Sequence, residues 1–341
     1  MIEQSQAPDI IDYLSSCAAA QICWLKSCQI LRPGHAADGA IARYPDQDSV
    51  MPYFSNYAAT AMLGDPSCYP LVERYLDWYL RSLERDGTIL DYSYGSNLNF
   101  KTARPDSEDA YVGTFLALAC LYHKKAGQAG WIKKILPSLK KVAGSIINLM
   151  DRDGLTFALA GYKVKYLMDN CEAYRGLADF AELLQSLGDR EATYFGSVAG
   201  KIAGGIERQL WNKRKSCYYA SKIGWLSRGA NLKNFYPDAA CQAFPVLCGL
   251  IEANGVKGAG LYNLFNDSQP KWPNIVPPPL SLDAPWSVCL HGDYNRAYEK
   301  ICCVREAYID QGSGKWYCAE VAFFIITCAR LLQDQDKWLS A

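Results

Sequence analysis

Acidic side chains crowd the start of one predicted helix, in the stretch "RPDSEDAYVGTFLALACLYHKKAG" at residues 104–127. Asp106, Ser107, Glu108 and Asp109 precede an apolar set with helical spacing, namely Val112, Phe115, Leu116 and Ala119. One polar residue is enough to cap the first backbone N–H groups of a helix. We therefore expect Asp106 or Ser107 to be the cap, which leaves Asp109, one turn further in, available for chemistry.

Paired carboxyl groups in a cleft are what glycosidic chemistry requires. One protonated carboxyl donates to the leaving oxygen, while an ionised one activates water or attacks the anomeric carbon. The two groups must feel different environments, so that one pKa is raised above the other. An enzyme of this kind should hold its two carboxyl groups about 5–10 Å apart.

Similar acidic starts recur along the chain. If the helices that carry them run in the same sense, their N-termini meet at one mouth, together with the acids Asp46, Asp48, Asp106, Glu108, Asp109, Asp169, Glu172, Asp238 and Asp283. For any one of these acids, a capping role worth about 0.5–2 kcal/mol is the simpler interpretation. A cap accounts for one carboxylate per helix, whereas "PDSED" supplies three.

The elements that position these acids alternate between two kinds of helix. Segments such as "RPDSEDAYVGTFLALA", "LMDNCEAYRGLADFA" and "KWYCAEVAFFIITCA" are rich in small residues and apolar on most faces, as buried helices are. Segments such as "VERYLDWYLRSLER" have a charged face. About six alternations predict an inner and an outer ring, an all-α (α/α)6 toroid.

Turns and short strands complete this prediction. Arg85-Asp86-Gly87 and Arg152-Asp153-Gly154 supply the positive-φ glycine that ends a helix. The segments "TILDYSY", "LTFALAGYKVKYL" and "SCYYASKIGWL" are expected to form short hairpins at one rim. No change of composition demands a second domain, so residues 1–341 are predicted to be a single toroid.

Composition excludes several classes of function. The 35 basic and 35 acidic residues balance, so there is no electrostatic signal for nucleic acid or an anionic membrane. No apolar run reaches the length of a membrane span, and no secretion signal is visible. Most of the 14 cysteines lie in apolar helical runs, which favours a reduced, cytoplasmic protein. Neither a G-x-G-x-x-G nor a Walker pattern is present, so no cofactor is expected.

Three motifs carry a resemblance to the six-hairpin glycosidases. "DSEDAYVGTFLALA" resembles the acidic helix start that carries a catalytic carboxylate in several of these enzymes. "YLMDNCEAYRGLADFAELL" is similar to the Asp-Asn element of the unsaturated glucuronyl and rhamnogalacturonyl hydrolases, and "ERQLWNKRKSCYYAS" to their aromatic hairpin. The resemblance implies an (α/α)6 toroid that hydrolyses an oligosaccharide.

The resemblance also implies roles for particular residues. Asp109 and Asp169 stand where the two catalytic carboxylates are expected, with Asp106, Glu108 and Asp238 as substitutes. In the unsaturated-sugar branch one such Asp protonates a double bond and activates water, whereas in the hydrolytic branch the pair divides the acid and base roles. Arg104 and Arg228 are expected to clamp a carboxylate on the sugar. The candidate stacking surfaces are Trp225, Tyr236, Trp272, Trp286 and Trp316.

Other toroidal proteins provide the alternatives. A sugar epimerase of this shape relies on histidine pairs, and of the three histidines His291 has the better claim to such a role. A zinc site is not expected, because His291 with the adjacent Cys302 and Cys303 makes a poor chelating set. A toroid that only binds a glycan or a peptide stays open, and the separation of the carboxyl groups is what distinguishes it from an enzyme. The sequence predicts no oligomeric state.

Overall fold

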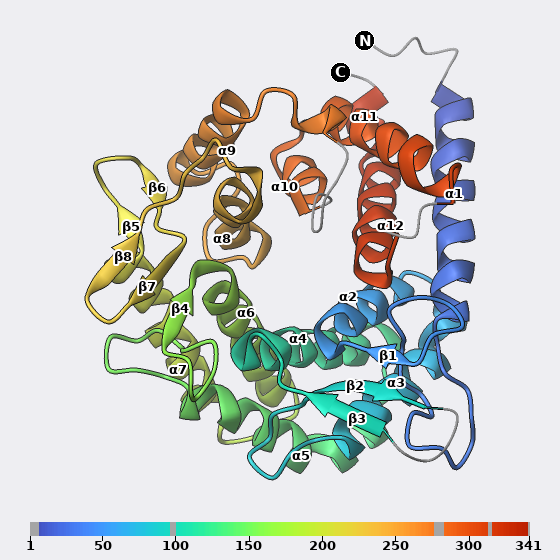
Figure 1. The fold of residues 1–341 in the computed structure, drawn as a ribbon, viewed down its shortest axis with the longest axis vertical. Helices are drawn as coiled ribbons and strands as arrows, with labels where there is room; N and C mark the ends of the chain where they lie inside the picture. The colour runs from blue at the N-terminus through green and yellow to red at the C-terminus, as the bar shows by residue number, and fades with distance from the viewer. Residues whose placement is uncertain (1–6, 96–99, 276–282, 313–315, 340–341) are drawn as a thin grey trace.

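The computed structural model describes residues 7–95, 100–275, 283–312 and 316–339. Helices dominate these residues, and Figure 1 shows them as two concentric rings. The outer helices are α1 (Ala7–Ser27), α3 (Tyr69–Arg81), α5 (Ala129–Asn148), α7 (Ala192–Gln209), α9 (Val256–Ser268) and α11 (Tyr294–Val304). The inner helices are α2 (Pro52–Met62), α4 (Glu108–Ala126), α6 (Leu167–Ser186), α8 (Phe244–Leu247), α10 (Asp283–His291) and α12 (Cys318–Gln333).

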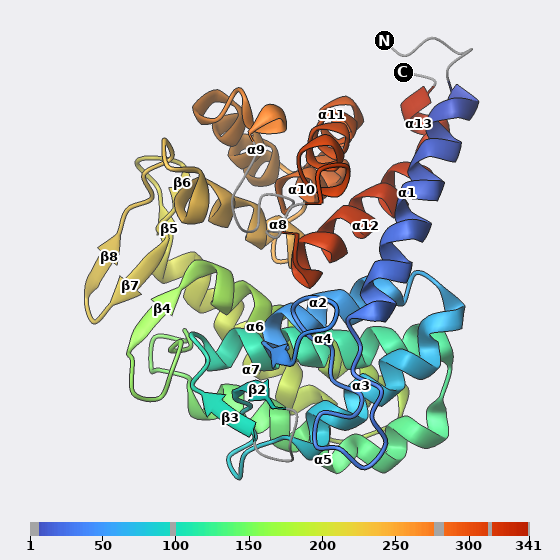
Figure 2. The ribbon, with the colours of Figure 1, turned by 45° about the vertical axis from the view of Figure 1, so that its right-hand side comes forward.

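The inner ring closes on itself, because each inner helix packs against the next one and α12 returns to α2. Helix α1 runs beside α12 on the outside of this closure (Figure 2). Short helical turns over Phe235–Ala243 lead into α8, and α13 (Gln335–Leu339) follows α12. The predicted (α/α)6 toroid is therefore confirmed. Its extent as one domain over residues 1–341 stays a prediction.

Burial explains why the two rings differ in sequence. Helix α12, with the sequence "CAEVAFFIITCARLLQ", is buried around most of its circumference. Helix α3 buries only one face, through Val72, Tyr75, Leu76, Trp78 and Tyr79. The apolar stripe of an outer helix needs only to cover the inner ring, whereas an inner helix has neighbours on several sides.

The strands are short. In Figure 1 one group lies beside the start of α4, and the other lies at the left edge of the ring, where its first strand leads into α6. One antiparallel sheet joins β1 (Ser49–Val50), β2 (Asp91–Tyr94) and β3 (Phe100–Ala103). A second joins β4 (Val164–Tyr166), β7 (Ser221–Ile223) and β8 (Leu226–Arg228), while β5 (Trp211–Asn212) pairs with β6 (Cys217–Tyr218). The predicted rim hairpins are present, and the two expected glycine turns have positive φ, +90° at Gly87 and +91° at Gly154.

Helices α4 and α6 approach each other closely through two glycines. A Cβ on Gly176 would lie 2.3 Å from the carbonyl oxygen of Gly113, and one on Gly113 would lie 2.5 Å from that of Glu172. Side chains do not fit at such distances, so the glycines permit the contact. Because both helices begin with an acidic turn, this contact also sets how close Asp109 and Asp169 can come.

The Gly176→Ala variant is expected to lose about 3 kcal/mol of stability, because its methyl group would push backbone against backbone. Gly200→Ala is the matched control: Gly200 lies on the exposed face of α7 with nothing within 4 Å of its would-be Cβ. The control should gain up to about 1 kcal/mol from helix propensity. Denaturant unfolding of both variants measures the difference, and equal stabilities would contradict the role assigned to the glycine contact.

Candidate active site

Asp109 and Asp169 lie next to each other at the starts of α4 and α6, joined by the hydroxyl of Ser107. The Oγ of Ser107 is 2.8 Å from Oδ1 of Asp109 and 2.7 Å from Oδ2 of Asp169. The two facing oxygens are therefore no farther apart than about 5.5 Å, which is the lower end of the separation expected for a glycosidase pair and leaves no room between them for an attacking water. Ser107 occupies the N-cap position of α4, as expected, but its hydroxyl makes no cap bond and contacts the two carboxyl groups instead.

Asp109 is the inner member of this pair. Its side chain is fully buried, whereas Asp169 is 8% exposed. Asp109 accepts hydrogen bonds from the hydroxyl of Thr156 at 2.5 Å and from its neighbour's backbone N–H, that of Ala110, at 3.0 Å. It is thus fixed in place by donors on three sides, while Asp169 keeps some access to solvent.

Thr156 is held in position by Asn170, the residue after Asp169. The side-chain oxygen of Asn170 accepts from the backbone N–H of Thr156 at 2.8 Å, and its amide donates to the carbonyls of Thr156 and Tyr166. The Asp-Asn pair of α6 therefore has two functions. Asp169 provides the carboxyl group, and Asn170 holds the loop that supports Asp109.

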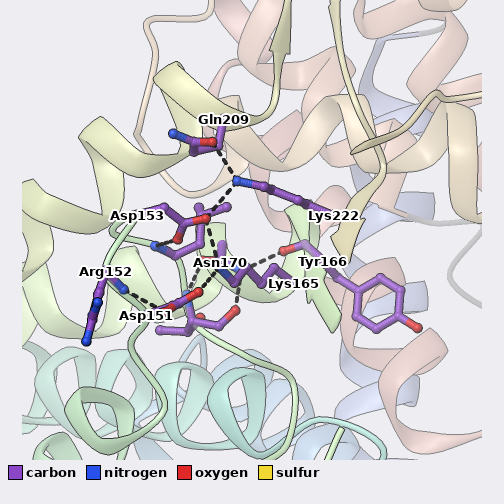
Figure 3. A network of polar contacts seen from close by, with 10 residues as sticks. Asp151, Arg152, Asp153, Lys165, Tyr166, Asn170, Gln209 and Lys222 are labelled. Carbon is purple, nitrogen blue, oxygen red and sulfur yellow. Dashed lines mark hydrogen bonds and ion pairs between the residues drawn. The ribbon is translucent and has the colours of Figure 1, made fainter. Parts of the chain in front are cut away.

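An ion network fixes the same loop on its other side (Figure 3). The ammonium of Lys165 is 2.5 Å from the Asp151 carboxylate and 2.8 Å from that of Asp153. Lys222, on β7, also contacts Asp153 at 2.8 Å and donates to Gln209 at 2.6 Å. Lys165 is only 1% exposed, so the network ties the turn before Thr156 to the strands of the rim from within the protein.

Burial raises the pKa values of both members of the carboxyl pair. It raises the pKa of Asp109 from 3.8 to about 6, against the lowering effect of its hydrogen bonds from Thr156 and Ser107. The pKa of Asp169 lies well above its ordinary value, first because of burial and then because of the negative charges of Asp109 and Glu172. Near neutral pH the pair therefore favours one protonated and one ionised member.

This shift predicts how stability changes with pH. A carboxyl group with a raised pKa binds its proton more tightly in the folded state, so the stability of the protein falls as pH rises through the window from about 4 to above 6. At pH 8, Asp169→Asn should be more stable than the wild type by about 1–3 kcal/mol, and the difference should vanish below about pH 4. Thermal unfolding at the two pH values measures it. A variant that is less stable at pH 8 would contradict the raised pKa values.

Two further acids of this region were not among the catalytic candidates, although Glu172 was among the acids expected at the mouth of the ring. Glu172 lies one helical turn after Asp169, and its Oε1 accepts from the phenols of Tyr53 at 2.8 Å and Tyr57 at 2.5 Å. On β2, burial raises the pKa of Asp91 to about 6. Two sequence patterns could have indicated this contact. In "DNCE" the i, i+3 spacing places Glu172 on the same helix face as Asp169, and in "YFSNY" the i, i+4 spacing places its two tyrosine partners on one helix face.

A cavity of about 490 Å³ lies inside the inner ring. It reaches from the level of Glu172 past Arg175, in the middle of α6, towards the C-terminal ends of the inner helices, where Lys124 and Arg330 line it. Trp286, on α10, lines the same space. Asp109 and Asp169 do not line it, because they lie in the first turns of α4 and α6, and the cavity extends from there towards the C-terminal ends of these helices. The carboxyl pair and this cavity are thus two separate features of the ring.

The substitute acids lie in three different settings. Asp106 is exposed in the loop before α4, and its charge contributes to the raised pKa of Asp169. Glu108 accepts from the backbone N–H of Ala160 at 3.2 Å. Asp238 is 1% exposed and forms an ion pair with Arg228 at 3.2 Å. Arg228 therefore already has a carboxylate partner within the protein, whereas Arg104 is exposed on the loop before α4.

The prediction that Trp272 and Trp316 are stacking surfaces for a sugar is wrong. Trp272 is fully buried and Trp316 is 5% exposed, because both indoles pack in the core and donate their N–H groups internally, to Asn266 and Gln21. Trp225 is 87% exposed at the tip of the β7–β8 hairpin. Tyr236 is half-buried and Trp286 lines the cavity, so three aromatic candidates keep an accessible face.

The alternative of a histidine-based epimerase gains no support from the place of His291. His291 stacks on the ring of Tyr262 at 4.6 Å, and burial lowers its pKa, so it lies on the α9–α10 side of the ring and not beside the carboxyl pair. Among the described residues, no group of His, Cys, Asp and Glu could hold a metal ion.

All 14 cysteines carry free thiols. No helix in the described part of the chain is long and apolar enough to cross a membrane.

The fold is shared with solved structures of glycosidases. A wild-type glycosidase matches with a TM-score of 0.71 and 12% sequence identity over 97% of this chain and 99% of that one. A variant glycosidase in complex with glucose matches with a TM-score of 0.70 and 10% identity over the same shares. A rhamnosidase from Klebsiella oxytoca with rhamnose bound matches with a TM-score of 0.60 and 10% identity over 93% of this chain and 64% of that one. No protein-family model and no curated protein sequence matches the chain.

Proposed function

We propose that the protein is a glycoside hydrolase that acts on an oligosaccharide, with Asp109 and Asp169 as its carboxyl pair. The observation that carries the proposal is the hydroxyl-bridged contact of two buried carboxyl groups at the starts of neighbouring inner helices. The shared fold with glycosidases, one of them in complex with glucose, supports a carbohydrate as the ligand. The fold alone is compatible with other activities, so the proposed activity rests on the residues of the site.

In this proposal Asp169 is the general acid. It is the member of the pair with solvent access, and its raised pKa keeps a proton available near neutral pH. As the glycosidic bond breaks, the proton of Asp169 passes to the leaving oxygen, and water supplies the hydroxyl group to the anomeric carbon. Asp109 remains buried and sets the electrostatic environment of the acid.

The water needs an ionised carboxylate to accept its proton. The charges that raise the pKa of Asp169, besides that of Asp109, belong to Glu172 and Asp106. Asp106 is exposed at the same mouth and Glu172 is buried behind it, so we assign the base role to Asp106. The free thiols fit a reducing compartment, so we retain the cytoplasm as the proposed location.

A panel of oligosaccharides tests the proposal. The wild-type protein should release new reducing ends from at least one member of the panel, and the Asp109→Asn/Asp169→Asn double variant should release none. A wild type that binds a member of the panel without cleaving it would instead support the glycan-binding toroid. Recovery of a stereoisomer of the substrate, with no cleavage, would support an epimerase.

A further inference from the structure

We propose that Ser107 is a positioning residue that relays a proton between Asp109 and Asp169, so that the two carboxyl groups share one proton. The catalytic consequence of this relay rests on the glycoside hydrolase activity proposed above. The relay itself is a property of the resting protein and does not depend on a substrate.

The relay follows from counting protons at one oxygen. Ser107 Oγ lies within hydrogen-bonding distance of a carboxyl oxygen on each side, at 2.8 and 2.7 Å. A hydroxyl group has a single proton to donate and two lone pairs that accept. It can satisfy one of the two contacts as donor, so the other contact needs a proton from the carboxyl group itself. One member of the pair must therefore be a neutral acid in this arrangement.

Two proton arrangements satisfy the count. In the first, Asp169 is protonated and donates to Ser107, which donates to ionised Asp109. In the second, Asp109 is protonated and donates to Ser107, which donates to ionised Asp169. The two interconvert when one proton crosses each hydrogen bond in the same direction, so the total number of protons is unchanged and no side chain has to move.

The surroundings favour the first arrangement at rest. Ionised Asp109 accepts additional hydrogen bonds from Thr156 and from the N–H of Ala110, which stabilise its charge. Ser107 is the one hydrogen-bond partner found for Asp169 among the described residues, so Asp169 gains less from ionisation. The second arrangement exchanges with the first while the pair holds its one proton. Once Asp169 has given that proton to the leaving oxygen, both carboxyl groups are ionised, and the proton that restores the pair enters from solvent at Asp169, its more exposed member.

Several other groups influence the titration of the pair. Glu172 and Cys171 follow Asp169 on α6, and Asp106 faces it from the loop before α4. Tyr166, which precedes α6, is a further titratable neighbour, and its own pKa is also raised, with burial as the main cause; Tyr162 and Arg228 act on Tyr166 in turn. Apart from the positively charged Arg228, each of these groups is either neutral or negatively charged, so it can shift the pKa values of the pair. None of them replaces the Ser107 hydroxyl as the bridge between the two carboxyl groups.

Carbon NMR of labelled aspartate side chains tests the relay without a substrate. In the wild type, the carboxyl carbons of Asp109 and Asp169 should both respond in two steps, at the same two pH values, because they share one proton. In Ser107→Ala, each carbon should show one dominant step of its own. Ser145→Ala is the matched control, since the buried Ser145 hydroxyl donates only to the carbonyl of Val142, at 2.7 Å. Wild-type carbons that titrate in separate single steps would overturn the relay.

Turnover provides the second test. Ser107→Ala should lower kcat by about 10²-fold, as expected when a general acid loses its positioning. The solvent isotope effect, measured in mixtures of light and heavy water, should change from a curved dependence on deuterium content to a linear one. A shared titration in a protein that cleaves no sugar would leave the relay standing and remove the hydrolase proposal. A wild-type isotope effect that is already linear would remove the relay from catalysis.

Discussion

The Asp169→Asn variant is expected to lose about 10²–10⁴-fold in kcat, with a change of less than about threefold in KM. The amide of asparagine matches the shape of the carboxyl group but cannot supply an acidic proton. The variant should therefore slow the chemical step, which lowers kcat, and leave substrate binding nearly unchanged. Steady-state kinetics on the best substrate of the oligosaccharide panel measure both constants.

Asp9→Asn is the matched control for this variant. Asp9 is an exposed carboxylate in the first turn of α1, an outer helix, so the change removes one helix-start charge far from the pair. Its kcat should equal that of the wild type. If Asp169→Asn retained the wild-type kcat, Asp169 could not be the general acid, and Glu172 would be the next candidate.

Removal of the buried ammonium in Lys165→Met is expected to cost about 3 kcal/mol of stability. Two carboxylates, those of Asp151 and Asp153, would lose a partner that lies 2.5 and 2.8 Å away. The expected cost is at the lower end for a broken buried ion pair, because Asp151 is 39% exposed and water screens its charge. The same turn leads to Thr156, so kcat should also fall, by about tenfold.

Lys163→Met separates these effects from the general loss of a lysine. Lys163 lies two residues earlier and is exposed, and its ammonium lies over the ring face of Phe157, at 5.4 Å. Its removal should change stability by less than about 1 kcal/mol. Urea unfolding of both variants measures the contrast. Equal stabilities would show that the network in Figure 3 is not what holds the loop.

The ring architecture was accessible from sequence because it depends on local patterns. Alternation of apolar and amphipathic helices predicts two rings, and a glycine after an Arg-Asp pair predicts positive φ at Gly87 and Gly154. The acidic starts of α4 and α6 could likewise be recognised, since cap-type residues concentrate before an apolar run. Each of these signals lies within about 20 residues of sequence.

The details of the site depend on contacts between distant residues. Thr156 reaches Asp109 across 47 positions, and Ser107 reaches Asp169 across 62. No local pattern distinguishes such a hydroxyl from an ordinary helix cap. Trp272 and Trp316 show the same difficulty, because an aromatic residue in a polar loop can fold back into the core when its N–H finds a partner there.

The most direct test of the central claim is a proton NMR time course of the wild-type protein with an oligosaccharide that it binds. Catalysis by the carboxyl pair predicts new anomeric signals that grow with time, and no such signals with Asp169→Asn at the same concentration. An oligosaccharide that both proteins bind and that the wild type leaves intact would contradict the claim, and the toroid would then be a binding protein.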